Sequence, residues 1–273
     1  MGGTAPAPGG EDDLVTTAAD LPALLDLATR GAHAAGAELL ARYGRIQGLD
    51  TKTSATDPVS DADRAAEALL VELITGERPD DGLLGEEGAS RPSSSGLRWV
   101  IDPLDGTVNY LYQLDNFSVS IAVEDADGGL AGVVYSPTID RTFWATRGGG
   151  AFANGRRLQV NDPVPMDRAL LATGFGYSPE RRAAQGALVA NLLPRVRDIR
   201  RIGSAALDLC SVAAGAVDGY FEEGVKAWDV AAGSLIAREA GAVVSTVTPT
   251  GDATGCLAAG PALHAALAAE LDG

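Results

Sequence analysis

The sequence predicts an α/β fold of the layered α+β kind, and two observations support this. The first part of the chain holds two helical patterns followed by Val- and Ile-rich strands. Past Pro165, strand and helix patterns alternate, as is typical of α/β proteins. With 273 residues, 46% of them hydrophobic, the chain can bury a full core as one large domain or as two intimately packed halves.

Two amphipathic helices are expected before the first strands. From Asp20 to about Tyr43, leucines and alanines recur at spacings of three and four, which indicates one apolar helix face. The polar segment 50–60 predicts a loop, and a second helix is predicted from Ser60 to Ile74. Asp61 and Asp63 lie in its first turn, where carboxylates interact favourably with the helix dipole. Capping of the helix is the simplest role for Asp61.

The next part of the chain predicts a sheet of short strands. Strands are predicted at 82–85, 98–102, 117–124, 130–135 and around Phe143–Ala145. The glycine-rich segment 147–155, RGGGAFANG, lacks the Lys-Ser/Thr and the βαβ context of a nucleotide-binding loop. It is therefore predicted to be a strand and a turn, with Asn154-Gly155 at a hairpin corner.

In the second half, the alternating pattern predicts strands at 168–173, 197–202, 217–222 and 242–247 and helices at 179–193, 204–214 and 229–240. His33 and His264 lie in separate alanine-rich helical stretches, so the chain lacks the residues for a zinc cluster or a histidine-based triad. Cys210 and Cys256 are too few for a disulfide framework and are expected to be buried thiols.

The charge of the chain argues against nucleic acid and acidic membrane surfaces as partners. Lys and Arg number 21 against 37 Asp and Glu, a net charge of −16. An anionic substrate would be repelled unless metal ions and helix N-termini reverse the sign locally. Membrane-spanning and signal-peptide patterns are absent from the sequence, so the protein is expected to be cytoplasmic, with residues 1–12 a disordered tail.

The segment Trp99–Asn109, WVIDPLDGTVN, carries the strongest chemical signal. Asp102 and Asp105 follow an apolar strand, and two carboxylates about 4 Å apart repel by roughly 4 kcal/mol at an effective dielectric of about 20. A positive ion is therefore expected between them. Pro103 is expected to take the backbone out of the sheet, which would free the Leu104 carbonyl as a further hard oxygen ligand.

The residues after Asp105 predict an anion site beside that ion. Gly106 and Thr107 are expected to open a helix, whose first amides have no partner within the helix. Such amides bind phosphate. A cation site next to a phosphate cradle is the result.

Three segments in this order resemble the inositol monophosphatase family of magnesium-dependent, lithium-sensitive phosphatases: GEE at 85–87, DPLDGTVN at 102–109 and WDVAAGSLIAREAG at 228–241. The likeness extends from about Asp26 to Ala259. It implies an αβαβα five-layer sandwich of the inositol monophosphatase and fructose-1,6-bisphosphatase type. It also implies a homodimer and a single phosphatase domain at 13–273, with halves at about 13–165 and 166–273.

The resemblance implies two or three Mg²⁺ ions in each active site. Glu86, Asp102 and the Leu104 carbonyl would hold one ion, and Asp102, Asp105 and Asp229 a second. Spacing alone shows only that Asp102 and Asp105 share a corner. For Asp229, which stands at the start of a predicted helix, a capping role is the structural alternative.

The family pattern implicates Asp63 and the Thr107 hydroxyl in orienting and deprotonating the attacking water, with Glu86 as a third catalytic residue. Asp61 lies two residues from Asp63, so the alignment could slip. The substrate contacts that the resemblance implies are Asp105, Gly106, Thr107, Ser204, Ala205, Glu222 and Asp229. A solvated carboxylate beside Glu223 is the alternative for Glu222.

The leading hypothesis is hydrolysis of myo-inositol 1-phosphate or a similar small phosphorylated polyol. Val108-Asn109 after DGT follows the inositol form of the family and departs from the Lys-Glu of relatives that cleave 3′-phosphoadenosine phosphates. Fructose-1,6-bisphosphatase and histidinol-phosphatase activities are the enzymatic alternatives. A transcription- or RNA-associated partner is the alternative from another class, with a contact patch at Arg195, Arg197, Arg200 and Arg201. Surface ion pairs or a pocket rim explain these arginines better.

Overall fold

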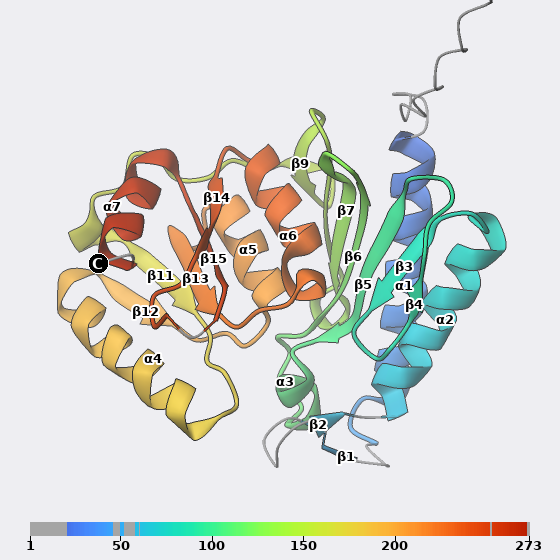
Figure 1. The fold of residues 1–273 in the computed structure, drawn as a ribbon, viewed down its shortest axis with the longest axis horizontal. Helices are drawn as coiled ribbons and strands as arrows, with labels where there is room; N and C mark the ends of the chain where they lie inside the picture. Colours follow the sequence, from blue (N-terminus) through green and yellow to red (C-terminus); the bar gives the residue numbers. More distant parts are fainter. Residues whose placement is uncertain (1–20, 46–49, 52–57, 60, 252, 272–273) are drawn as a thin grey trace, which may run out of the picture.

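Five layers of helices and sheets build the described part of the chain (Figure 1). The computed structural model describes residues 21–45, 50–51, 58–59, 61–251 and 253–271. The predicted tail and most of the predicted 50–60 loop lie outside these residues. The layers run in the order helices, eight-stranded sheet, helices, five-stranded sheet, helices, as the five-layer prediction requires.

Two long helices form the first layer, α1 (Leu21–Arg42) and α2 (Asp61–Glu77). The apolar face predicted for the first helix is confirmed, because Leu24, Ala28 and Leu39 of α1 are buried. In α2, Ala62, Ala66 and Leu70 recur every four residues and are also buried. This face of α2 packs with α1 on the eight-stranded sheet. This packing therefore positions the N-terminal end of α2, which carries Asp63, relative to the sheet.

The first sheet is almost wholly antiparallel, with strand order β10-β9-β8-β7-β6-β5-β3-β4. Its strands are β3 (Gly82–Gly85), β4 (Ser90–Arg91), β5 (Arg98–Asp105), β6 (Ser118–Asp125), β7 (Gly128–Ser136), β8 (Arg141–Thr146), β9 (Gly150–Ala153) and β10 (Arg156–Arg157). Only the β3–β5 pair of this sheet is parallel, which brings the C-terminal ends of these two strands to one edge. Glu86 follows one of these ends, and Asp102 lies near the other.

The prediction that the chain leaves the sheet at Pro103 is wrong. β5 continues to Asp105, and its pairing with β6 shifts register, from Asp102 opposite Ser120 to Asp105 opposite Ser118. Two residues of β5, Pro103 and Leu104, thus lie opposite Val119 alone on β6, which is a β-bulge. A bulge tolerates proline because it interrupts the ladder of hydrogen bonds.

The glycine-rich segment is a strand and a turn, as predicted. β8 and β9 pair as a hairpin, and β9 turns back into β10 at Asn154 and Gly155, whose φ angles are 45° and 78°. Positive φ at both central residues is the requirement of the type I′ turn that Asn-Gly favours. The segment therefore shapes a sheet edge.

The second sheet is mixed, with strand order β12-β11-β13-β15-β14. Its strands are β11 (Leu170–Thr173), β12 (Asp198–Arg200), β13 (Gly219–Glu223), β14 (Val243–Val247) and β15 (Gly255–Ala259). Sequence reasoning missed β15, which lies antiparallel between β13 and β14. Its sequence, GCLAA, is short and rich in small residues, so it carries little strand propensity.

Helices α5 (Ala205–Ala213) and α6 (Ala227–Glu239) form the layer between the two sheets. Ala206 and Cys210 of α5 pack toward the first sheet, and Leu209 and Val212 pack toward the second. This explains why α5 is apolar around most of its circumference. Helices α4 (Pro179–Leu192) and α7 (Pro261–Leu271) cover the outer face of the second sheet.

Both cysteines are buried free thiols, as predicted. The histidines have ordinary structural partners: His33 Nε2 lies 2.8 Å from Thr142 Oγ1, and His264 Nε2 lies 2.9 Å from Ser245 Oγ. Among the described residues, the helices are too short or too polar to cross a membrane.

The contrast between Leu70 and Leu40 tests the packing of the first layer. Leu70 is fully buried, whereas Leu40 is 41% exposed. We expect Leu70→Ala to lower the free energy of unfolding by about 2–5 kcal/mol, because it leaves a cavity under α2. Leu40→Ala should change it by less than about 1 kcal/mol. Urea unfolding of both variants measures this, and equal losses would contradict the arrangement of α1 and α2 described above.

Candidate active site

The site is built on the bulge at the end of β5. Asp102 is 1% exposed, and its Oδ1 accepts a hydrogen bond of 3.0 Å from the Leu104 amide. Asp105 Oδ2 accepts hydrogen bonds from Ser204 Oγ at 2.6 Å and from the Ala206 amide at 2.8 Å. Asp105 therefore ties the first sheet to the N-terminus of α5, where helix amides favour negative charge.

Acidic side chains from three other elements converge on Asp102. Burial raises its pKa well above the ordinary value, and the negative charges of Glu86, Asp105, Asp229 and Asp63 raise it further. These groups come from the turn after β3, from α6 and from α2. The two predicted ligands that are distant in sequence, Glu86 and Asp229, thus lie within electrostatic reach of the Asp102–Asp105 corner.

The pKa of Asp105 rises less, to about 6. Burial is the main cause, and the hydrogen bonds from Ser204 and Ala206 oppose it because they stabilise the ionised form. Asp105 thus binds a proton less tightly than Asp102, because the Asp105 carboxylate accepts more hydrogen bonds.

Asp229 occupies the third position of α6, and its Oδ2 accepts a hydrogen bond of 2.6 Å from the Lys226 amide. The capping role considered for this residue is therefore real. Burial and the charge of Asp105 also raise the pKa of Asp229 well above its ordinary value. One carboxyl group both caps the helix and faces the corner.

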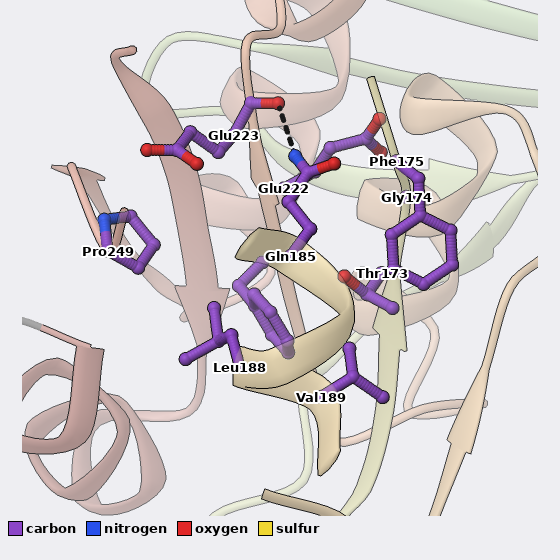
Figure 2. A pocket seen from close by; sticks show the side chains of 10 residues that line it. Thr173, Gly174, Phe175, Gln185, Leu188, Val189, Glu222, Glu223 and Pro249 are labelled. Carbon is purple, nitrogen blue, oxygen red and sulfur yellow. Dashed lines mark hydrogen bonds between the residues drawn. The ribbon is translucent and has the colours of Figure 1, made fainter. Parts of the chain in front are cut away.

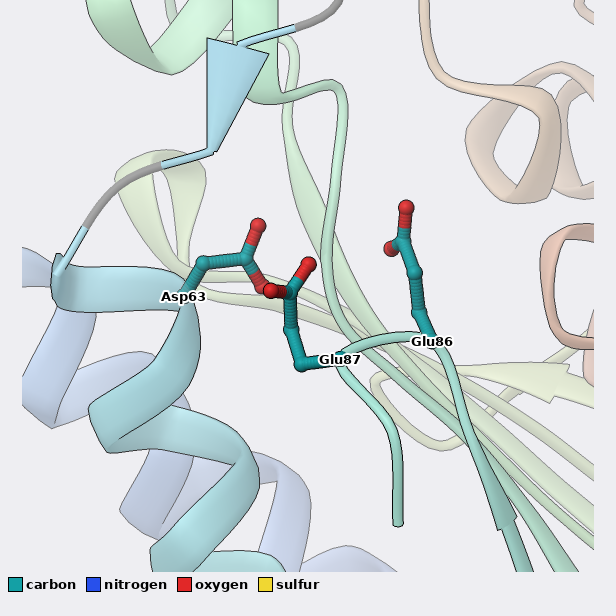
Figure 3. A group of neighbouring side chains, drawn as sticks. All are labelled: Asp63, Glu86 and Glu87. Atoms are coloured by element: carbon teal, nitrogen blue, oxygen red, sulfur yellow. The ribbon is translucent and has the colours of Figure 1, made fainter. Parts of the chain in front are cut away.

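A second acidic cluster lies beside the first and consists of Asp63, Glu86 and Glu87 (Figure 3). One carboxylate oxygen from each lies within 4.8 Å of the others, and no other such group of three was found in the described part of the chain. Asp61, by contrast, is exposed and pairs with Arg64 at 2.6 Å. The structure thus separates the two aspartates that the sequence left ambiguous, and it adds Glu87, to which the sequence analysis assigned no role.

Helix α3 (Thr107–Leu111) begins as predicted, directly after Gly106. Gly106 has a φ of 94°, and a Cβ there would lie 2.9 Å from the Asn116 carbonyl oxygen, so only glycine fits. The Thr107 hydroxyl donates to the Leu104 carbonyl at 3.1 Å. The Thr107 hydroxyl, predicted to orient the attacking water, thus contacts the Leu104 carbonyl, which is predicted to bind a metal ion.

Asn109 joins the two halves of the site. It is 5% exposed, and its Nδ2 donates to the carbonyls of Asn116 at 2.6 Å and Ile202 at 2.8 Å. The first carbonyl precedes β6, and the second precedes α5. This side chain therefore fixes α3 against the segment that delivers Ser204.

The predicted substrate-side residues have defined partners. The Ser204 hydroxyl is buried, engages Asp105 and accepts from the Leu207 amide, so it acts on Asp105 and on α5. A direct contact of Ser204 or Ala205 with substrate stays a prediction. Glu222 Oε2 accepts from the Tyr220 hydroxyl at 3.1 Å, and burial raises the pKa of Glu222 to about 7. Glu222 is therefore not the solvated carboxylate of the alternative interpretation.

A hollow adjoins Glu222 between α4 and the ends of β11 and β13 (Figure 2). It holds about 230 Å³ of empty space, part of it open to solvent. Its walls are Thr173, Gly174, Phe175, Gln185, Leu188, Val189, Phe221, Glu222, Glu223 and Pro249. Because part of this space is open solvent, the hollow is a recess beside Glu222.

The arginines proposed as a contact patch are mostly used within the chain. Arg195 pairs with Glu270, Arg200 pairs with Asp198, and Arg197 Nε donates to the Arg168 carbonyl. The charge of Arg201 acts on Glu222 and Asp208. The interpretation as surface ion pairs is confirmed for Arg195 and Arg200.

Sequence reasoning missed Asp208, which lies 1% exposed in α5. Burial raises its pKa to about 9, and the negative charges of Glu222 and Asp105 contribute. Its carboxyl oxygens have no hydrogen-bond partner among the described residues. An acidic residue inside the apolar run AALDLC was the available signal.

The donor set fits a hard divalent cation. The charges that act most strongly on Asp102, those of four acidic side chains, are all negative. Carboxylate and carbonyl oxygens are the ligands that Mg²⁺ and Ca²⁺ select. Asp102, Asp105 and Asp229 each use one oxygen in a hydrogen bond to a backbone amide, which fixes the direction of the carboxylate.

Comparisons with known proteins agree with this geometry. The model of the inositol monophosphatase family matches residues 20–273. The chain is 46% identical to Nus factor SuhB of Pasteurella multocida over 81% of its length and 84% of the relative. It is 43% identical to inositol-1-monophosphatase of Mycobacterium leprae over 89% of its length and 87% of the relative. The crystal structure of the extragenic suppressor protein SuhB from Bartonella henselae superposes with a TM-score of 0.84 at 36% identity, covering 91% of this chain and 98% of that one.

The raised pKa values predict how cation binding depends on pH. Asp105 and Glu222 titrate at about 6 and about 7, above their values of about 4 in an unfolded chain. Their protons therefore stabilise the fold at low pH, and this contribution is lost as pH rises through the folded values. A cation bound by Asp105 must displace the proton of that carboxyl group, so the increase in Tm with excess MgCl₂ should grow between about pH 5 and about pH 7.

Thermal unfolding with and without MgCl₂ across this pH range measures the effect. Asp102→Asn provides the control, because it should remove most of the Mg²⁺-dependent increase at every pH. An increase in Tm that does not vary with pH, or that persists in the variant, would place the cation elsewhere.

Proposed function

This chain belongs to the inositol monophosphatase family, and from that premise we propose that it is a magnesium-dependent phosphatase that hydrolyses myo-inositol 1-phosphate or a similar small polyol phosphate. The single observation that carries the proposal is the convergence of Glu86, Asp105 and Asp229 on buried Asp102. Phosphate monoesters hydrolyse extremely slowly without catalysis, so a site of this kind must stabilise charge at both the attacking and the leaving oxygen.

The proposed ligands form two overlapping sets that share Asp102. Glu86, Asp102 and the Leu104 carbonyl would hold one ion, and Asp102, Asp105 and Asp229 would hold the next, with two or three Mg²⁺ in all. When bound, these ions supply charge neutralisation for the phosphoryl oxygens and lower the pKa of water. The tight Asp63–Glu86–Glu87 group supports a further ion on the α2 side.

Asp63 and Thr107 are proposed to handle the attacking water. The hydrogen of the Thr107 hydroxyl is committed to the Leu104 carbonyl, so its oxygen faces the site as an acceptor. A water held by that oxygen can give its proton to Asp63, which is fully buried at the start of α2. Glu86, close to Asp63, orients the same region.

Substrate recognition is proposed to use the amides of Gly106 and Thr107 for phosphate and the N-terminal segment of α5, Ser204-Ala205, for the ring. Glu222, held by Tyr220, accepts a hydroxyl of the polyol. Asp105 and Asp229 complete the contacts with the substrate.

We also propose that Li⁺ inhibits the protein, that it forms a homodimer and that it is located in the cytoplasm. The single-domain organisation set out above is part of the same proposal.

Two alternatives to hydrolysis of myo-inositol 1-phosphate are considered, namely other substrates and a role without catalysis. Fructose 1,6-bisphosphate or histidinol phosphate are alternative substrates for the same chemistry. Relatives named Nus factor SuhB favour a second candidate, a role as a Nus factor that needs no turnover. The internal pairing of Arg195 and Arg200 weakens the case for a basic contact patch, so the phosphatase remains our conclusion.

Phosphate release separates these functions. We expect Mg²⁺-dependent release from myo-inositol 1-phosphate to exceed release from fructose 1,6-bisphosphate and histidinol phosphate, and Li⁺ to inhibit it. Asp102→Asn should lower kcat/KM by at least about 100-fold, because both proposed metal sites lose a shared ligand. A wild-type protein that releases phosphate from none of the three esters would support the non-catalytic role.

A matched pair of variants tests the role of Asp63. Asp63→Asn should lower kcat by about 10²–10⁴-fold at saturating Mg²⁺, because the amide cannot accept the proton of the attacking water. Asp61→Asn removes the same charge two residues away, from an exposed side chain paired with Arg64, and should leave kcat nearly unchanged. Steady-state kinetics of both variants would expose a wrong assignment if Asp61→Asn were the impaired one.

A further inference from the structure

Glu67 is a buried acid of α2 that the proposed mechanism does not use. It is 6% exposed. Its Oε2 accepts a hydrogen bond of 2.8 Å from the Glu87 amide, and its Oε1 accepts one of 2.9 Å from the Ala89 amide. Both oxygens therefore bind the backbone of the turn that connects β3 to β4.

The turn is shaped around this carboxylate. It begins at Gly85, whose amide donates to the Ala89 carbonyl at 2.7 Å. A Cβ at Gly85 would lie 2.4 Å from Glu67 Oε2, so the carboxylate occupies the space that any side chain at this position would need. The backbone amides of the turn thus bind the Glu67 carboxylate of α2.

The same helix face carries a member of the acidic cluster. Asp63 precedes Glu67 by four residues, so the two side chains lie one turn apart on one side of α2. Asp63 clusters with Glu86 and Glu87, which stand on the turn that Glu67 binds. Helix α2 therefore supplies one acid of the cluster and also sets the position of the other two.

This arrangement has to resist repulsion. Three carboxylates with oxygens within 4.8 Å of one another push the turn away from α2 unless a cation lies among them. Glu67 is itself negative or protonated, so charge alone gives it no attraction to the cluster. Its two hydrogen bonds to the amides of Glu87 and Ala89 are what keep the turn at its distance from α2.

We propose that Glu67 is a positioning residue that presets the Glu86–Glu87 turn for a divalent cation shared with Asp63. The inference rests on the proposed function and deepens it. Glu67 touches neither cation nor substrate in this scheme. Its loss should therefore weaken cation binding far more than it lowers the maximal rate.

Glu67→Gln tests the proposal, because a carboxamide keeps one acceptor and turns an NH₂ group toward the second amide. The Mg²⁺ dissociation constant from calorimetry, and the MgCl₂ concentration for half-maximal rate, should rise by about 10–100-fold. The rate at saturating Mg²⁺ should stay within about threefold of wild type, as expected for a lost outer contact. Glu72→Gln, an exposed glutamate of the same helix, is the matched control and should change neither quantity.

Amide hydrogen exchange of the cation-free protein gives an independent readout. The amides of Glu87 and Ala89 should exchange faster in Glu67→Gln than in wild type, while the core amides of β5 keep their protection. Unchanged exchange at both amides, or unchanged Mg²⁺ affinity, would overturn the proposal. Absence of Mg²⁺ binding by the wild-type protein would overturn the proposed function itself.

Two glycine variants test the position of the Glu67 carboxylate without changing the charge of the protein. Gly85→Ala should displace the Glu67 carboxylate and reproduce the loss of Mg²⁺ affinity seen in Glu67→Gln. Gly76→Ala lies in α2 with no atom within 4 Å of the added Cβ, so it should bind Mg²⁺ as wild type does. Circular dichroism would check that Gly85→Ala is folded. A Mg²⁺ affinity equal to that of wild type in this variant would show that the turn does not depend on the position of the Glu67 carboxylate.

Discussion

Mutual repulsion among buried carboxylates is the constraint on which the rest of this structure depends. Asp102, Asp105 and Asp229 meet where the two sheets approach α5 and α6, and burial raises the pKa of each. Each also accepts a hydrogen bond from a backbone amide, at Leu104, Ala206 and Lys226. Because amides stabilise an ionised carboxylate and fix its direction, they let the fold keep a set of like charges in place.

The five layers explain why these charges can come from distant parts of the chain. The parallel β3–β5 pair brings Glu86 to the edge where Asp102 lies, and α6, packed between the sheets, brings Asp229 to it from the other side. The hydroxyls of Ser118 and Ser204, 3.2 Å apart, join the first sheet to α5 at the same seam. Contacts that stabilise the packing of the layers therefore also set the geometry of the site.

The sequence predicted the parts of the site that depend on local patterns. The first helix followed from leucine and alanine spacing, the helix that carries Asp63 followed from the polar loop before it, and the Asp102–Asp105 corner followed from a strand interrupted by proline and glycine. The contacts of Glu67 and Glu87 could not be predicted, because they depend on how α2 and the turn after β3 pack together in the fold. The continuation of β5 past Pro103 was missed for a related reason, since only the pairing with β6 shows that a bulge absorbs the proline.

The same electrostatics order the events of the proposed reaction. A chain of net charge −16, with buried acids around Asp102, repels a phosphate ester until divalent cations lie among the carboxylates. In the proposed reaction, cation binding would therefore precede productive substrate binding. Protons can neutralise the same carboxylates, but they leave no ligand for the phosphoryl oxygens. The pH at which these acids lose their protons thus sets the lower limit of the range in which the site can work.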